Sequence, residues 1–326
     1  MLAFLGDAYS TAYGLVNSML LRLTFPLEVC FAYFLLETLL PRGTKRNSLG
    51  SYGRGAYFVA ASVAINQFVL AAATWLIDVD RIAPLAVLDL SPLTESEILP
   101  VRVAGWLVAA FAIMMIANFF YYWLHRAQHR IPWLWRFHRV HHSITEMSAT
   151  SSYHHFAEDL FQFTAVTVPM AFLLGVATGP VPWIVLTIAS THAYFIHSSA
   201  NINIGPFRYI LGENRFHRIH HSLEERHFDR NFATLTPLWD VLFGTAYFPR
   251  ADEWPNVGLA DIPEPKTMRD YLLMPFRASG AVGQEHGQGE GPGFRPRPHA
   301  LALSSAHPAE SRDPSRPGRA GAPQAR

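Results

Sequence analysis

Long apolar stretches alternate with short polar connections over the first 200 residues of this 326-residue chain. Each stretch is near the length that crosses a bilayer as a helix, too long for a strand and too uniformly apolar for a surface helix. The pattern therefore predicts an all-α integral membrane protein with four to five transmembrane helices. The stretches are residues 18–40, 56–77, 103–124, 160–178 and 181–198.

The first stretch is the least regular of the five, because it carries Arg22, Glu28 and Glu37 together with Pro26. A charge inside a membrane must pair, reach the interface or face a cavity. We therefore expect this stretch to be tilted or partly interfacial.

The charges of the connections predict the orientation in the membrane. The connection after the first stretch has four basic residues and no acidic one, whereas the next connection is mainly acidic. By the positive-inside rule the first connection is cytoplasmic. The third stretch then returns to that side, and the last two stretches form a hairpin that leaves and re-enters by the same face. The sequence from about residue 125 to the C-terminus, outside the hairpin, is thus expected on the cytoplasmic side.

Composition divides the chain into three regions. Residues 1–102 form an N-terminal membrane region with two spans, and residues 103–276 combine a histidine-rich part with the membrane hairpin. Residues 277–326 are rich in Gly, Pro, Ser, Arg and Ala, a composition that predicts a disordered tail. The N-terminus lacks the basic region and cleavage site of a secretory signal, so we expect no cleaved leader.

The overall charge and the cysteine count exclude several classes of protein. Basic and acidic residues number 26 and 25, so no net positive field would attract nucleic acid. Cys30 is the single cysteine, which excludes a disulfide framework, a thiolate zinc site and a cysteine-held iron–sulfur cluster within one chain. The 16 histidines are the unusual feature of the composition.

The histidines form three patterned strings, HRAQH at 125–129, HRVHH at 138–142 and HRIHH at 217–221. Residues three or four apart lie on one face of a helix, so each string can direct at least two imidazoles at one point. Imidazoles without thiolates suit iron, zinc, copper or nickel. The strings hold more ligands than one metal accepts, which predicts a di-metal site in a cytoplasmic helical cap. Their histidines are His125, His129, His138, His141, His142, His217, His220 and His221.

Several motifs together resemble the fatty acid hydroxylase superfamily, which includes sterol desaturases, sterol methyl oxidases, fatty acid hydroxylases and alkylglycerol monooxygenase. They are FFYYWLHRAQH at 119–129, LWRFHRVHHS at 134–143, YHHFAED at 153–159, His197, RFHRIHHS at 215–222 and RNFATLTPLWDVLFGTAYFP at 230–249. The resemblance covers about 130 residues and makes 103–276 a fatty acid hydroxylase-like catalytic region. It implies a non-haem di-iron centre, O2 as oxidant and a lipid substrate from the bilayer.

The resemblance also implies a set of site residues. The eight string histidines and His197 fall on the family's ligand motifs, and no catalytic group is assigned beyond the metal centre. Some members place another ligand where this chain has Ala193, and His155 and His192 are the possible additional ligands. Asn231 and Asp240 match recurrent positions and could orient ligating imidazoles. We expect a ligating histidine or an arginine as the partner of the Asp240 carboxylate.

The expected activity is O2-dependent hydroxylation or desaturation of a membrane lipid such as a sterol, an acyl chain or a related lipid. Electrons must come from an external ferredoxin or cytochrome-like protein with its reductase, since the chain has no dinucleotide motif or haem-binding segment of its own. Zinc could replace iron in recombinant protein. A metal transporter and a haem-binding cytochrome are the alternatives. Six arginines could dock the donor or simply follow the positive-inside rule, namely Arg126, Arg130, Arg136, Arg139, Arg215 and Arg218.

Overall fold

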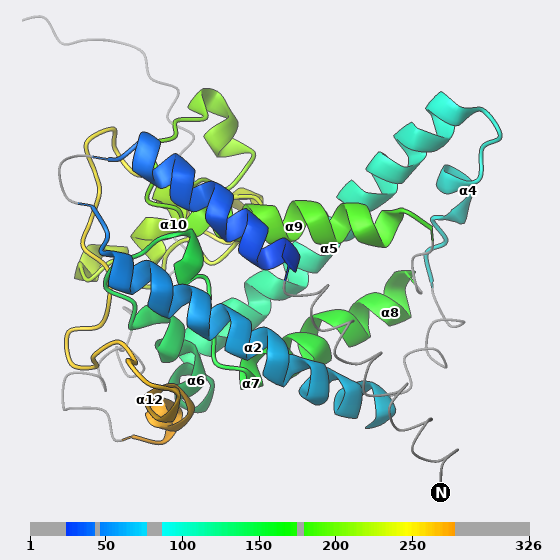
Figure 1. Cartoon of the computed structure of the whole chain (residues 1–326). Coiled ribbons are helices and arrows are strands. Elements are labelled where there is room, and N and C mark those ends of the chain that lie inside the picture. The colour runs from blue at the N-terminus through cyan, green and yellow to red at the C-terminus, as the bar shows by residue number, and fades with distance from the viewer. Residues whose placement is uncertain (1–23, 43–45, 77–86, 175–178, 278–326) are drawn as a thin grey trace, which may run out of the picture. The chain divides into compact units, whose positions relative to one another are not determined.

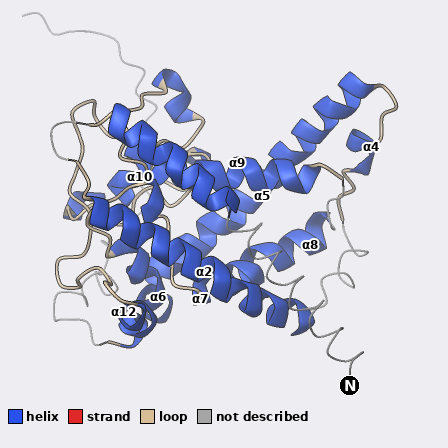
Figure 2. Cartoon of the chain, viewed as in Figure 1, coloured by secondary structure: helices blue, strands red, loops and turns tan. Residues whose placement is uncertain are grey.

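The computed structural model describes residues 24–42, 46–76, 87–174 and 179–277. These ranges consist of helices, turns and loops, with no strand among them, which confirms the all-α prediction for this part of the chain (Figure 2). The chain divides into two units, Met1–Gln288 and Gly289–Arg326, and all described residues belong to the first. The predicted tail beyond Arg277 and the start of the first apolar stretch lie outside the described residues.

Long helical runs occupy all five apolar stretches. They are residues 24–39, α2 (Leu49–Leu76), α5 (Leu99–Arg130), the run of α7 (Ala157–Gln162), the π-helical η3 (Phe163–Thr167) and α8 (Val168–Leu174), and α9 (Val181–His197). The shorter elements are α4 (Ser91–Thr94), α6 (Pro132–His142), α10 (Asn214–His220), α11 (Leu238–Leu242), α12 (Met268–Leu273), η2 (Ala149–Ser151), η4 (Gly205–Tyr209), η5 (Glu225–His227) and η6 (Met274–Phe276).

Two of the long runs, Leu99–Arg130 and Ala157–Leu174, are long and apolar enough to cross a membrane. On α5 the side chains of Leu107, Val108 and Phe111 are more than half exposed. Such a row of exposed apolar side chains suits contact with lipid rather than water. The count of four to five spans remains a prediction.

Glu37, one of the charges in the first apolar stretch, is buried and fully paired. Its Oε2 accepts from the Tyr52 hydroxyl at 2.6 Å, and its Oε1 accepts from the backbone N–H groups of Ala149 at 2.9 Å and Ser199 at 3.1 Å. The carboxylate therefore joins the helix over 24–39 to α2, to η2 and to the segment after α9. A buried charge is tolerated when hydrogen bonds replace its lost water.

The chain turns sharply between α5 and α6, and this turn helps to assemble the histidines. Ile131 is extended because the residue before a proline avoids the helical region. Pro132 then begins α6, where its missing N–H is not needed. As a result the rings of His129 on α5 and His138 on α6 lie 5.1 Å apart. Figure 1 shows α6, α10 and α12 together at one end of the long helices.

Two of the six arginines considered for donor docking point inward. Arg139 is 1% exposed and donates to the carbonyl oxygens of Met274 and Arg277. Arg215 is 5% exposed and donates to the carbonyl oxygen of Arg250. The idea that these two form a docking surface is therefore wrong, because their charge is used to hold neighbouring backbone.

Candidate metal centre

The nine predicted ligand histidines converge in two adjacent groups. The five-histidine group consists of His125, His129, His138, His142 and His220, and the four-histidine group consists of His141, His197, His217 and His221. Within each group the ligand nitrogens lie within 4.8 Å of one another. The groups draw on the ends of α5 and α9 and on α6, α10 and the residue that follows α10.

Each HxxHH string is divided between the two groups. On α6 the first and last histidines, His138 and His142, join the five-histidine group, while His141 joins the other. After α9 the arrangement is reversed, since His217 and His221 join the four-histidine group and His220 crosses over. Around a helix, position i+4 lies about 40° to one side of position i and position i+3 about 60° to the other side, so these two side chains diverge by about 100°. Each string can therefore direct its imidazoles at two neighbouring points.

The distances between imidazole nitrogens fit metal coordination. In the five-histidine group His138 Nε2 lies 2.9 Å from His125 Nε2 and 3.1 Å from His142 Nε2. In the four-histidine group the neighbouring Nε2 atoms are 3.0–3.2 Å apart. Ligand atoms bound to one ion at about 2.0–2.1 Å, the usual metal–imidazole distance, are separated by similar amounts.

Hydrogen bonds on the other ring nitrogen show which nitrogens are free to bind metal. Four histidines donate through Nδ1 to a backbone carbonyl oxygen. The pairs are His125 with Phe232 (2.6 Å), His141 with Tyr153 (2.9 Å), His197 with Ala193 (2.7 Å) and His220 with Arg230 (2.8 Å). His138 Nδ1 donates to Glu158 Oε2 at 2.8 Å.

A neutral imidazole that donates through Nδ1 carries a lone pair on Nε2. The Nε2 atoms of His125 and His138, and those of His141 and His197, are therefore pairs of acceptors facing each other at 2.9 and 3.1 Å. Two acceptors cannot bond each other, but a cation between them would satisfy both. The residues present thus fit two metal ions.

Burial keeps these imidazoles in the neutral form that binds metal. It lowers the pKa of His138 and of His220 to about 3, and it holds the pKa of His141 and His217 well below the usual value. Protons therefore compete weakly for these ligands near neutral pH.

Asn231 and Asp240 support the five-histidine group through the backbone. Asn231 has a positive φ of 59° and donates Nδ2 to the carbonyl oxygens of Phe216 and Tyr247. Asp240 accepts from the backbone N–H groups of Phe232 and Ala233, both at 2.8 Å. The segment they hold, 230–233, presents the carbonyl oxygens that orient His220 and His125.

Neither partner expected for Asp240 hydrogen-bonds to it, although the charge of Arg126 acts on its carboxyl from a distance. Its hydrogen-bond partners in the described part of the chain are two backbone N–H groups and the Thr245 hydroxyl at 2.6 Å, with no histidine or arginine among them. Burial raises the pKa of Asp240 to about 6, and these hydrogen bonds act against that rise.

The two possible additional ligands lie outside both groups. His155 accepts from the Ala157 N–H through Nδ1, and its ring packs on Tyr271 at 5.3 Å. His192 donates Nε2 to the carbonyl oxygen of Gly212 at 2.9 Å. Neither is a ligand in the arrangement seen here.

Sequence reasoning missed two neighbours of the groups, His154 and Glu158. With His138 they form a third set of potential ligands. The His154 ring stacks on His141 at 3.7 Å, and Gln128 donates to the same Glu158 oxygen that holds His138. The available signal in the sequence was the Glu158 carboxylate in the first turn of an apolar helix, because a buried carboxylate needs a hydrogen-bonding partner.

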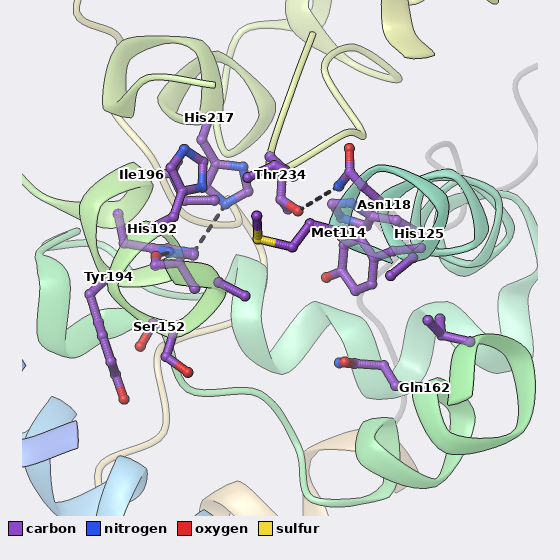
Figure 3. Close-up of a pocket in the computed structure, with 18 of the residues that line it drawn as sticks. Met114, Asn118, His125, Ser152, Gln162, His192, Tyr194, Ile196, His217 and Thr234 are labelled. Atoms are coloured by element: carbon purple, nitrogen blue, oxygen red, sulfur yellow. Dashed lines mark hydrogen bonds between the residues drawn. The ribbon is translucent and has the colours of Figure 1, made fainter. Parts of the chain in front are cut away.

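A cavity of about 430 Å³ leads from the histidines into the apolar helices (Figure 3). Three members of the four-histidine group line it, His141, His197 and His217, but only His125 of the other group does. Apolar side chains from α5, η3 and α9 line its far part, including Met114, Val166, Val185 and Ala189. The volume lies within the range of small-molecule binding sites.

Comparison with known proteins agrees with this geometry. Residues 110–245 match the family model described as "Fatty acid hydroxylase". The chain is 30% identical over 171 residues to the ornithine lipid hydroxylase OlsE of Rhizobium tropici, covering 51% of this chain and 50% of that protein. It is 27% identical over 128 residues to the alkylglycerol monooxygenase of Homo sapiens, covering 39% and 28%.

A third relative is the very-long-chain aldehyde decarbonylase GL1-6 of Oryza sativa subsp. japonica, 32% identical over 154 residues that cover 43% of this chain and 23% of that protein. The chain thus spans half or less of the length of these relatives. No solved structure gives a significant match. The resemblance to the fatty acid hydroxylase superfamily is confirmed.

Proposed function

On the premise that residues 110–245 are a fatty acid hydroxylase region, we propose that the protein is an O2-dependent non-haem di-iron oxidoreductase that hydroxylates or desaturates a C–H bond of a membrane lipid. One observation carries this proposal. Two adjacent all-histidine groups, of which eight of the nine members are buried, lie at the end of a cavity that extends between apolar helices. The named activities of the relatives, lipid hydroxylation and monooxygenation, support the same class.

The chain's own groups hold the metals, fix the imidazole orientations and exclude water. Two iron ions bound there would supply the activation of O2 needed to break an unactivated C–H bond. Hydroxylation puts one oxygen atom of O2 into the lipid and reduces the other to water, so electrons and protons must be delivered. We propose an external ferredoxin or cytochrome-like donor with its reductase. Zinc is expected to compete for the site in recombinant protein.

The membrane arrangement remains part of the proposal. We infer a multi-pass protein with the histidine groups and the C-terminus on the cytoplasmic side, where the basic connections would lie. A reporter fused after residue 50 or after residue 276 is expected to read cytoplasmic, and one fused near residue 90 external. An external signal after residue 276 would overturn both the orientation and the cytoplasmic donor.

The geometry argues against the two alternatives. Rings of the two groups approach as closely as 4.3 Å, for example His142 and His221, which leaves no space for a porphyrin between them. A transporter would place its ligands along a path through the membrane. Here all nine lie near the ends of α5 and α9 and on the short helices beside them.

Comparative lipid mass spectrometry tests the proposed reaction directly. Cells that express the full chain are compared with cells that express the His141→Ala, His220→Ala double variant. We expect the intact chain alone to produce lipids that have gained one oxygen or lost two hydrogens. Identical lipid profiles, with both proteins present in the membrane at equal amounts, would refute the proposed function.

A further inference from the structure

A connected series of polar groups, which the metal centre does not use, links two of the helices that line the cavity. We call Asn118, His192, Gly212 and Thr234 the polar wall. Asn118 Nδ2 donates to Thr234 Oγ1 at 3.0 Å, and His192 Nε2 donates to the Gly212 carbonyl oxygen at 2.9 Å. The Gly212 N–H donates to the carbonyl oxygen of Leu235, next to Thr234, at 2.9 Å. The polar wall thus crosses from α5 to α9.

The side chains of the polar wall come from opposite sides of the cavity. Figure 3 shows Asn118 on α5 and His192 on α9, with Thr234 between them. Asn118 is 5% exposed and His192 is 9% exposed, and both line the cavity. Polar side chains at this depth are unfavourable unless they have a structural or binding role.

Three hydrogen-bonding positions on the polar wall are left for a ligand. Because Thr234 Oγ1 accepts from Asn118, its own O–H is free to donate, and no acceptor for it is present in the described ranges. Because His192 donates through Nε2, its Nδ1 carries a lone pair, for which the described residues provide no donor. Asn118 Oδ1 is likewise buried without a hydrogen-bond partner. The polar wall therefore offers one donor and two acceptors.

Gly212 brings Thr234 and His192 together. A Cβ atom at this residue would lie 2.3 Å from the Thr234 carbonyl oxygen and 3.6 Å from His192 Cε1. A side chain would therefore push the loop away from the Thr234 carbonyl oxygen, whereas its contact with His192 would be an ordinary one. The lack of a Cβ permits the close approach on which the polar wall depends.

The polar wall lies a short distance along the helices from the metal ligands. Asn118 precedes His125 by two turns of α5, and His192 precedes His197 by about one and a half turns of α9. At 1.5 Å per residue these spacings are about 8–11 Å along the helix axes. A lipid group bound to the polar wall would therefore leave the neighbouring part of the molecule beside the four-histidine group.

We propose that the polar wall is a subsite for a hydroxyl or amide group of the lipid substrate, a group that can both donate and accept. Such a subsite fixes the oxidised carbon by its distance from the polar group rather than from the end of the hydrocarbon chain. The inference rests on the proposed function and adds a substrate class to it, lipids whose reacting carbon lies near a hydrogen-bonding group.

Binding measurements on the zinc-loaded full chain in detergent micelles test the subsite without turnover. The probes are radiolabelled hexadecyl glycerol ether, the same compound with both hydroxyls methylated, and hexadecane. We expect the free glycerol ether to bind about tenfold or more tightly than the methylated form, since losing one or two hydrogen bonds has an effect of this size. Equal affinities, or no binding of the hydroxylated probe, would overturn the subsite.

Substitutions show which residues of the polar wall produce the preference for free hydroxyl groups. Thr234→Val and His192→Leu are each expected to reduce the preference for free hydroxyls to less than about threefold, and Thr234→Ser, which keeps the hydroxyl, is expected to retain it. Metal content should equal that of the unmodified chain in all three, because these residues belong to neither histidine group. A preference unchanged in Thr234→Val and His192→Leu would also overturn the subsite.

Binding and oxidation can fail separately. A selective subsite in a chain that oxidises no cellular lipid would refute the proposed function and leave the binding site. Oxidation by a chain that binds free and methylated probes equally would refute the subsite and leave the proposed function.

Discussion

The five-histidine and four-histidine groups consist of the same residue type, yet their surroundings differ. Glu158 and the carbonyl oxygens of 230–233 surround the first group, and only His125 in it lines the cavity. The second group has three cavity-lining members, His141, His197 and His217. Ala193 also lines the cavity beside this group. It occupies the position at which some members of the family are expected to have a further ligand.

This difference resembles the distinction between structural and catalytic metal sites. A structural site uses protein ligands at all positions, whereas a catalytic site keeps a position open for water, substrate or oxidant. We infer that the four-histidine group is where O2 and lipid meet a metal, and that the five-histidine group holds its metal more tightly.

Removing one ligand from each group tests most directly whether the two groups hold metal differently. We expect the purified, iron-loaded chain to hold close to two metal ions. His141→Ala leaves three ligands beside the cavity and should lose one ion and all measurable lipid oxidation. His220→Ala leaves four ligands and should lower the metal content less. Elemental analysis measures both, and equal losses from the two variants, or at most one ion in the unmodified chain, would contradict the distinction.

Asp240→Asn tests whether the backbone support of the five-histidine group matters. The amide cannot accept from both Phe232 N–H and Ala233 N–H, so the carbonyl oxygen that orients His125 should shift. Turnover is expected to fall about 10–100-fold, the usual effect of losing an outer-sphere partner. Asp252→Asn, at an exposed aspartate, is the control and should retain full activity. Equal activities of the two variants would show that the 230–233 segment holds itself in place.

Ala193→His tests the open position by adding a ligand there instead of removing one. One turn of α9 separates residue 193 from His197, so the new imidazole would reach the same group. Loss of one metal to a chelator should become about tenfold slower, and loss of the other should not change. Unchanged kinetics for both metals would mean that Ala193 does not mark a vacant ligand position.

A smaller effect is expected from the titration of Asp240. Burial raises its pKa from the usual 3.8 to about 6, so the folded chain holds this proton more tightly than the unfolded chain. The stability it contributes is present below pH 4 and is lost as the pH rises to about 6. The unmodified chain should therefore lose a few degrees of thermal stability relative to Asp240→Asn over this interval. A difference that stays constant or grows with pH would reverse the sign of the argument.

The sequence predicted the metal centre better than its surroundings because histidine spacing is a local property. The i, i+3 and i+4 separations were enough to identify eight of the nine members of the two groups, and His197 was added by the family resemblance. They could not show that His141 and His220 cross to the other group, since this depends on how α6 and α10 face each other. The hydrogen-bond partners of Asp240 were not predicted for a similar reason, because a sequence does not show which backbone N–H groups a fold brings to a side chain.

The helices were predictable from their apolar runs, but their ends were not. Helix α5 begins at Leu99 rather than near residue 103, since Pro100 suits the first turn of a helix. In the YHHFAED segment the sequence favoured His155 over its neighbour His154, which stacks on His141. Periodicity does not extend through a turn, so it could not distinguish the two.

The crossing of His141 and His220 between groups has a consequence for biosynthesis. The five-histidine group takes four members from residues 125–142 and one from far along the chain, and the four-histidine group takes one member from 125–142 and three from 197–221. Neither group is complete while the ribosome is still making the membrane hairpin. We therefore expect neither group to reach its full set of ligands until His220 and His221 have been synthesised.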